Sequence, residues 1–323
     1  MQKQMPIRNA LRRILPPRAY AALRNIKCSP ARFFQWSLEK CGFVVARTSD
    51  YYSPLPSRRK LRATMPRWSQ PSALRGVSYD LDAMKSTLRS LINTYAEEFA
   101  SLIPYEQALQ LGFGPGYTRL DAQVLYAALR THKPARYLEV GSGLSTFYAA
   151  QAALQNEREG RPMQITCIEP FPFAALHTIP GITLIEKEVQ DVALDRFTAL
   201  GPGDVLFIDS SHIVRLDGDV PFLFLEVLPA LAPGPLIHIH DIPFPFHCPY
   251  PPDYWIYKPV WPMWWNESML LHALLCGNPS FAITLSTPLL RFHDETFLQS
   301  LIPGYQTIAG EPNTFSSIWL QRL

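Results

Sequence analysis

The sequence predicts an α/β fold: a doubly wound, seven-stranded sheet with an antiparallel last strand, preceded by a helical N-terminal region. Short β-rich apolar runs alternate with helical stretches from about residue 113 onward, which is typical of a parallel α/β sheet. Turn-forming residues, Pro303-Gly304 and Gly310 to Asn313, separate the last two runs and favour an antiparallel return of the final strand. A helical repeat of apolar residues precedes the sheet.

Each expected element follows from a local pattern. Apolar residues recur at three- and four-residue steps over Tyr79–Leu102, which predicts an amphipathic helix, and Asp121–His132 continues as a second helix. The seven runs predicted as strands are Arg136–Val140, Ile165–Glu169, Ile182–Ile185, Val205–Asp209, Leu236–Asp241, Phe281–Ser286 and Phe315–Gln321.

Charge and proline divide the chain into three regions. Residues 1–50 form a basic helical segment, in which Ile7–Leu15 stops at two prolines and Arg18–Ile26 begins again. Residues 1–40 hold nine Lys/Arg and only one acid, so their net charge is +8. The rest of the chain carries −5, which gives the total of +3. This segment is expected to be a solvated helix or a contact to an anionic membrane face or a partner, with a mitochondrial presequence as the remaining alternative. Residues 51–112 form a proline-rich connector and the amphipathic helix, and residues 113–323 hold the sheet.

Composition excludes several classes. Over 323 residues, 47% are hydrophobic and 18% charged, which argues against disorder, collagen and coiled coil. The five cysteines contain no CxxC pair, so neither a disulfide framework nor a structural zinc site is expected. The expected location of the protein is a reducing cytoplasm. We expect no membrane-spanning helix and no secretory signal. A nucleic-acid partner is not expected, because the body of the chain is acidic.

A glycine turn carries the strongest functional signal. Leu138–Thr146 (LEVGSGLST) is a strand, a turn with Gly141 and Gly143, and the start of a helix, an arrangement that presents backbone amides to a ligand. The alternative is a tight connection with no ligand. Thr146 stands where the dinucleotide-binding motif has its third glycine, which weakens an NAD interpretation.

The charge beside this turn separates two cofactors. Glu139 lies two residues before Gly141, where a carboxylate would repel a pyrophosphate but suits a sulfonium or ammonium group, as in S-adenosylmethionine. Glu169 ends the second strand, 28 residues after Gly141, where an acid can accept both ribose hydroxyls of either cofactor.

These residues resemble a known family. From about Phe113 to the end, the chain resembles class I S-adenosylmethionine-dependent methyltransferases, specifically methyltransferase family 24 and its bacterial O-methyltransferase and cephalosporin-hydroxylase-like relatives. The segments that carry the resemblance are Leu138–Thr146, Cys167–Pro172, Asp204–His212, Leu228–Gly234 with His238–Ile242, and Trp265–Glu267. The resemblance implies a Rossmann-like methyltransferase domain over residues 113–323.

The resemblance also assigns roles to individual residues. It implies that Glu139, Gly141, Ser142, Gly143 and Ser145 surround the methionine half of the cofactor, that Glu169 holds the ribose, that Gln190 and Asp191 contact adenine, and that Asp209 lies near the methionine and the substrate. The implied reaction is O-methylation of a small-molecule or glycan acceptor.

A divalent cation is a further expectation. Asp209 and Asp241 follow neighbouring strands and are expected to share Mg²⁺ or Mn²⁺, which can lower the pKa of a bound hydroxyl. Related metal-assisted enzymes have an acidic pair where this chain has His240-Asp241, which shifts the expected ion toward Mn²⁺, Fe²⁺ or Zn²⁺ or leaves the site metal-free. Strand alternation points His238 and His240 away from Asp241 unless the chain bends.

His212, just past Asp209, is the first candidate for a general base, since a neutral imidazole titrates in the useful range; a structural histidine is the alternative. His240 and His247 are weaker candidates. Pro243–Trp265 holds many prolines and aromatics and is expected to cover the substrate or to form a packing flap or homo-oligomer contact.

Three other classes remain open at this point. They are an NAD-dependent oxidoreductase, a metal-dependent hydroxylase or hydrolase built on His212, His238, His240 and Asp241, and a partner-binding module without catalysis.

Overall fold

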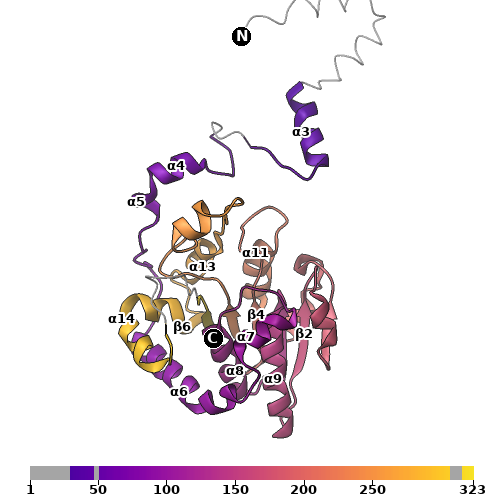
Figure 1. The fold of residues 1–323 in the computed structure, drawn as a ribbon, viewed down its shortest axis with the longest axis vertical. Helices are drawn as coiled ribbons and strands as arrows, with labels where there is room; N and C mark the ends of the chain where they lie inside the picture. Colours follow the sequence, from indigo (N-terminus) through magenta and orange to yellow (C-terminus); the bar gives the residue numbers. More distant parts are fainter. Residues whose placement is uncertain (1–29, 47–50, 306–314) are drawn as a thin grey trace, which may run out of the picture. The chain divides into compact units, whose positions relative to one another are not determined.

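The computed structural model of the chain describes residues 30–46, 51–305 and 315–323 (Figure 1). The two helices predicted within Ile7–Leu15 and Arg18–Ile26 lie outside these residues. The chain divides into two compact units, Met1–Met65 and Pro66–Leu323.

The first unit contains short helices. They are α3 (Pro30–Lys40) and α4 (Arg58–Ala63), while α5 (Met65–Trp68) spans the boundary. Helix α4 begins at Ser57, whose hydroxyl accepts a hydrogen bond from the backbone N–H of Lys60. The aromatic side chains of α3, Phe33, Phe34 and Trp36, are exposed. Across the described ranges, no helix combines the length and apolar character that a membrane crossing requires.

The second unit is built on one seven-stranded sheet with the order β3-β2-β1-β4-β5-β7-β6. The strands are β1 (Arg136–Val140), β2 (Gln164–Ile168), β3 (Ile182–Ile185), β4 (Val205–Ile208), β5 (Leu236–Ile239), β6 (Phe281–Ser286) and β7 (Ile318–Arg322). Strands β1 to β5 pair in parallel, and β7 lies antiparallel between β5 and β6. The predicted fold class, including the antiparallel last strand, is therefore confirmed.

Burial explains why the central strands are apolar runs rather than alternating ones. Every residue of β4 and β5 is buried, as expected for parallel strands that are covered on both faces. Strands β2, β4 and β5 end one or two residues earlier than predicted, whereas β1, β3 and β6 end as predicted. As a result, Glu169, Asp209 and Asp241 lie just beyond the strands, at the carboxyl edge of the sheet. The last strand begins at Ile318 rather than Phe315.

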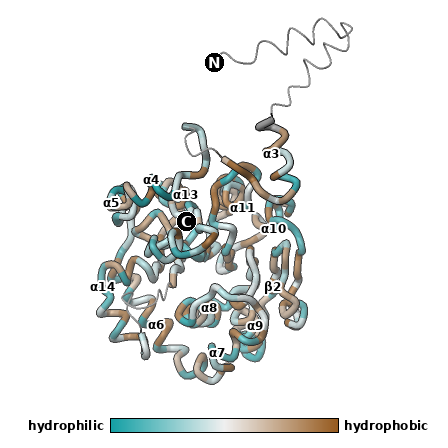
Figure 2. The backbone as a smooth tube through the Cα atoms, turned by 45° about the horizontal axis from the view of Figure 1, so that its top comes forward, coloured by the Kyte–Doolittle hydropathy of each residue, from teal (hydrophilic) through white to brown (hydrophobic). Residues whose placement is uncertain are grey.

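Helices α6 (Leu81–Ala100), α8 (Arg119–His132) and α9 (Leu144–Arg158) pack in succession, and α6 also contacts β6 and α14 (Thr287–Leu301). Both hydrophilic and hydrophobic residues occur along these helices (Figure 2); α6 buries one face, whereas α8 is buried on nearly all sides. Helix α6 therefore belongs to the same compact unit as the sheet.

Shorter elements complete this unit. They are α7 (Tyr105–Ala108), α10 (Asp195–Thr198), α11 (Asp219–Phe222), α12 (Leu228–Ala230) and α13 (Glu267–Leu275), the 3₁₀ turns η1 (Leu109–Leu111), η2 (Ala174–Thr178) and η3 (Val189–Asp191), and the π-helical turns η4 (Leu223–Val227) and η5 (Asp253–Tyr257).

The strand order places the functional residues. The chain runs from β1 outward to β3, then crosses back to β4 and continues to β5, so the winding direction reverses between β1 and β4. In open α/β sheets, the crevice at such a reversal is where ligands bind. The turn that follows β1, the acid that follows β4 and the His-Asp pair that follows β5 all lie at this edge.

Candidate active site

The glycine turn joins β1 to α9 and is held by its neighbours. The Gly141 N–H donates to the Ile168 carbonyl (3.0 Å), and the Asp209 N–H donates to the Val140 carbonyl (2.8 Å). Gly143 precedes α9 and passes so close to Phe113 that a Cβ at this position would lie 2.8 Å from the Phe113 carbonyl oxygen. Both glycines are therefore required by close backbone approach.

Glu139 lies beside the turn, as predicted, and its side chain is enclosed by the protein. Its carboxylate is fully buried and accepts hydrogen bonds from the hydroxyls of Ser145 (2.5 Å) and Thr146 (2.7 Å). Burial raises the pKa of Glu139 to about 7, against the lowering effect of these hydrogen bonds. The hydrogen bond between Ser145 and Glu139 thus links the start of α9 to β1. The two side chains contact each other rather than an open cavity.

A cavity of about 280 Å³ opens beside the turn. Among the predicted cofactor residues, Gly141, Glu169, Gln190 and Asp209 line it, while Glu139, Ser142, Gly143, Ser145 and Asp191 do not. The charged side chains in its lining are four acids, Glu169, Glu188, Asp209 and Asp219, and one base, Arg215. The cavity is therefore predominantly negative.

Two polar side chains of this cavity are fixed by the backbone or by neighbours. Glu169 accepts hydrogen bonds from the N–H groups of Ser142 (3.2 Å) and Phe171 (2.8 Å). The amide of Gln190 donates to the Glu188 carboxylate (2.6 Å) and to the Asp217 carbonyl (3.2 Å). Glu169 in particular is held in place at the end of β2, next to the glycine turn.

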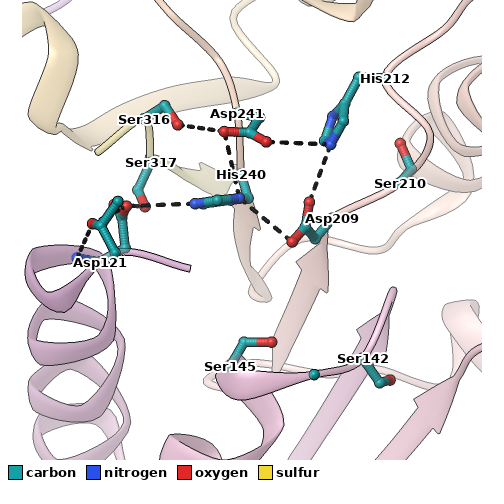
Figure 3. A network of polar contacts seen from close by, with 12 residues as sticks. Asp121, Ser142, Ser145, Asp209, Ser210, His212, His240, Asp241, Ser316 and Ser317 are labelled. Carbon is teal, nitrogen blue, oxygen red and sulfur yellow. Dashed lines mark hydrogen bonds and ion pairs between the residues drawn. The ribbon is translucent and has the colours of Figure 1, made fainter. Parts of the chain in front are cut away.

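A cluster of aspartates and histidines adjoins this cavity (Figure 3). One ligand atom each from Asp209, His240 and Asp241 lie within 4.8 Å of one another. The bend that strand alternation requires is present, because Asp241 adopts a positive φ of 55° directly after β5. The three residues predicted to share a cation are thus brought together, and the side chain of Ser316 donates to Asp241 (2.6 Å).

Two imidazoles point into this cluster. His240 directs Nδ1 toward Asp209 (3.4 Å) and Asp241 (3.7 Å), and His212 directs Nε2 toward the same two acids (3.1 and 3.5 Å). The opposite ring nitrogens contact buried carboxylates. Nε2 of His240 lies 3.4 Å from Asp121, and Nδ1 of His212 lies 2.7 Å from Glu267.

These surroundings change the protonation of the predicted base. Burial by itself lowers the pKa of His212, but the adjacent carboxylates of Asp209 and Glu267 raise it to about 10. The pKa of His240 is raised as well, by Asp241 and Asp209 against its burial. These contacts favour the protonated imidazolium form of His212, whereas a general base acts in the neutral form; the assignment of His212 as the base stays a prediction.

His238 does not join the cluster. It lies within β5, two residues before His240, so its ring sits deeper in the sheet, with the two ring centroids 6.2 Å apart. It stacks on Phe207 and contacts Trp319, and burial lowers its pKa to about 3. Among the described residues, the group of possible metal ligands at this edge includes His240 but not His238.

Asp121, Glu267 and Ser316 were missed as site residues. Asp121 lies in the first turn of α8, accepts a hydrogen bond from Ser317 and is completely buried. Glu267 opens α13 and is also buried. In the sequence, an acid in the first turn of a helix is expected on structural grounds alone. What distinguishes Asp121 and Glu267 is their burial, which the structure shows and the sequence does not.

A second cavity, of about 310 Å³, lies next to this cluster. The predicted covering segment contributes Pro243, Phe244, Phe246, Tyr250 and Pro251 to its wall, and Ser316 lines it as well. Phe246 and Tyr250 stack with ring centroids 3.7 Å apart. Arg291 is buried in the same wall, and its Nη2 has no hydrogen-bond partner within the described residues. Ser316 therefore connects this aromatic cavity to Asp241.

The geometry agrees with a family match. Residues 138–242 match the model of methyltransferase family 24, described as a methyltransferase domain. This segment is similar to that family. The matched segment begins in β1, includes the glycine turn and Glu169, and ends directly after Asp241.

Several solved structures are similar to the chain. An O-methyltransferase from Streptomyces achromogenes, in complex with SAM, shares 15% identity over 76% of this chain and 91% of its own, with a TM-score of 0.38. An SAH-bound methyltransferase from Podospora anserina shares 16% identity over 83% and 98%, with a TM-score of 0.36. An O-methyltransferase from Bacillus cereus, in complex with SAH, shares 14% over 74% and 91%, with a TM-score of 0.38. No curated protein matches the chain.

Proposed function

We propose that the chain is an S-adenosylmethionine-dependent methyltransferase that acts on a hydroxyl oxygen. The observation that carries this proposal is the cavity beside the glycine turn, whose charged lining consists of four carboxylates and one arginine. Such a lining attracts a sulfonium and an ammonium group and repels the pyrophosphate of NAD. The family match of residues 138–242 supports the same reaction class.

The cavity residues have distinct tasks in this proposal. Glu169, held by two backbone amides, binds the ribose hydroxyls, and Gln190 borders the adenine. Gly141 keeps the backbone of β1 close to Asp209, so that the methyl donor lies between the turn and the aspartate cluster. S-adenosylmethionine supplies a sulfonium-bound methyl group.

We propose that Asp209, His240 and Asp241 hold a divalent cation, as in metal-assisted O-methyltransferases. The residues present fit such an ion, because Nδ1 of His240 is buried, faces both carboxylates and has no hydrogen-bond partner in the part of the chain that the structure describes. When bound, a cation of this kind lowers the pKa of an acceptor hydroxyl.

The acceptor is proposed to occupy the aromatic cavity that Ser316 connects to Asp241. The stacked pair Phe246 and Tyr250 provides a flat wall for a small metabolite or a sugar ring, and Arg291 offers an unused donor. During transfer, the S–CH₃ bond breaks as the O–CH₃ bond forms, and sulfur keeps the electron pair. The acceptor proton is released to solvent, and the other product is S-adenosylhomocysteine.

Calorimetric titration of the full chain with S-adenosylmethionine, S-adenosylhomocysteine and NAD tests the proposal. The first two should bind saturably and NAD should not. Glu169→Ala should weaken binding of both by about 10- to 100-fold, because a charged hydrogen-bonding group contributes ~1.5–3 kcal/mol.

Glu186→Ala is the matched control, since Glu186 is an exposed acid near the end of β3 and does not line the cavity. It should bind S-adenosylmethionine as tightly as the unmodified chain. Binding of NAD, or of neither cofactor, would reject the proposed reaction.

A further inference from the structure

We infer that His212 is a fourth metal ligand rather than the general base, and that the completed site of Asp209, His212, His240 and Asp241 selects a first-row transition ion such as Mn²⁺, Fe²⁺ or Zn²⁺ over Mg²⁺. The inference rests on the cation site of the proposed function, and it does not depend on the identity of the methyl donor.

Ligand atoms of Asp209, His240 and Asp241 lie within 4.8 Å of one another, and His212 contacts both carboxylates of this group. The imidazole nitrogens of His212 and His240 lie 3.1–3.7 Å from the carboxylate oxygens of Asp209 and Asp241. Two donors bound to one ion at ~2.1 Å are about 3.0–3.4 Å apart at octahedral or tetrahedral angles. The observed separations are close to this range, and both rings approach the same pair of acids from different sides (Figure 3).

The outer contacts of each ring fix the orientation that ligation needs. Glu267 accepts from Nδ1 of His212 (2.7 Å), and Asp121 faces Nε2 of His240 (3.4 Å). With a proton on each outer nitrogen, the inner nitrogens, Nε2 of His212 and Nδ1 of His240, present lone pairs to the cluster. A carboxylate behind a histidine in this way is the usual arrangement for a metal-binding imidazole, and here it occurs twice.

The contacts of the two rings with Asp209 and Asp241, here called the inner contacts, are long for hydrogen bonds. Hydrogen bonds between an imidazolium and a carboxylate usually measure ~2.7–2.9 Å. The four inner contacts measure 3.1–3.7 Å, and among the described residues Nδ1 of His240 is buried with no hydrogen-bond partner. Asp121, Glu267 and His240 are also almost completely inaccessible, so their arrangement is not a surface accident.

The donor set determines the metal class. Mg²⁺ is bound through oxygen atoms and retains several waters, whereas imidazole suits Mn²⁺, Fe²⁺ and Zn²⁺. A site with two imidazoles and two carboxylates, both rings being oriented by buried acids, therefore favours a transition ion. The role of Asp121 and Glu267 is to position the two rings.

The test uses the full chain after removal of bound metal with a chelator. Calorimetric titrations with MnCl₂ and MgCl₂ should show Mn²⁺ binding at least 100-fold more tightly than Mg²⁺. Pulsed electron paramagnetic resonance of the bound Mn²⁺ should detect two coupled imidazole nitrogens. In His212→Ala it should detect one, with affinity for Mn²⁺ reduced about 10- to 100-fold.

His177→Ala is the matched control, because His177 is exposed and distant in sequence from the cluster; it should retain both nitrogens and full affinity. If His212→Ala fails to fold, the nitrogen count and the metal preference of the unmodified chain decide the question. One coupled nitrogen in the unmodified chain, equal affinity for Mg²⁺, or no metal binding would overturn the inference.

S-adenosylmethionine is titrated into the same samples to separate the two proposals. Cofactor binding with a single coupled nitrogen rejects His212 as a ligand and leaves the proposed reaction standing. Two coupled nitrogens without cofactor binding support the four-residue site and reject the proposed reaction.

Discussion

Gly141 and Asp209 are in such close contact that a Cβ on Gly141 would lie 1.8 Å from the backbone carbonyl oxygen of Asp209. Gly141 follows β1 and Asp209 follows β4, the two strands between which the winding of the sheet reverses. The turn proposed to bind the methyl donor and the first acid of the proposed cation site are therefore one connected structure. A displacement of either should affect both.

Replacement of Gly141 by alanine tests this connection. The new Cβ has no room, and the backbone has a φ of +79°, which alanine adopts only with strain. We expect Gly141→Ala to lose measurable S-adenosylmethionine binding and to have a lower melting temperature. Gly160→Ala is the control, since Gly160 has a φ of +73° but open space around its Cβ, and should cost only about 1 kcal/mol of unfolding free energy. Equal effects of the two substitutions would contradict the close approach.

A buried arginine joins three helices of the second unit. Arg130 of α8 donates to Glu98 of α6 through Nε (2.6 Å), and it also contacts Asn156 and Glu159 at the end of α9. Arg130→Ala removes the group that links the three helices and leaves the buried Asn156 Oδ1 without this donor, so we expect a loss of about 2 kcal/mol in unfolding free energy. Urea denaturation measures it.

Arg158 of α9 provides the comparison for this prediction. Its guanidinium is exposed and contacts only Gln155 of the same helix among the described residues. Arg158→Ala should change the unfolding free energy by less than ~0.5 kcal/mol. An effect of Arg130→Ala no larger than that of Arg158→Ala would show that the helices do not depend on this network.

The sequence was sufficient for the fold because its signals are local. Alternating strands and helices, the glycine turn and the acids that end β2 and β4 all follow from the order of residues along the chain. The adjacency of Asp209 and Asp241 also followed, because parallel neighbouring strands end at one edge.

The rest of the site depends on contacts between residues distant in the sequence. Asp121 meets His240, and Glu267 meets His212, only after α8 and α13 have packed beside the sheet. The protonation of His212 depends on those partners, so the sequence could not supply it. Glu139 shows the opposite case: its position beside the turn was predicted, but its burial, and hence its structural role, was not.

The buried carboxyl group of Glu139 should make the stability of the chain depend on pH. Its pKa is raised from 4.5 to about 7 by burial, so the folded chain retains a proton that the unfolded chain loses above about pH 4.5. The stabilising contribution of this proton is complete below pH 4.5 and is lost as the pH rises through 7. The shift corresponds to a loss of about 3 kcal/mol.

Glu139→Gln keeps an acceptor for the hydroxyl of Ser145 or Thr146 but cannot ionise. Denaturation of both proteins at intervals from pH 5 to pH 8 should show that the unmodified chain loses stability relative to Glu139→Gln as the pH increases. Taking this difference cancels the contributions of the other titrating groups. Glu186→Gln, at an exposed position, should follow the unmodified chain at every pH. If the Glu139→Gln and unmodified curves run parallel, Glu139 is ionised in the folded chain across this range and its burial does not control its proton.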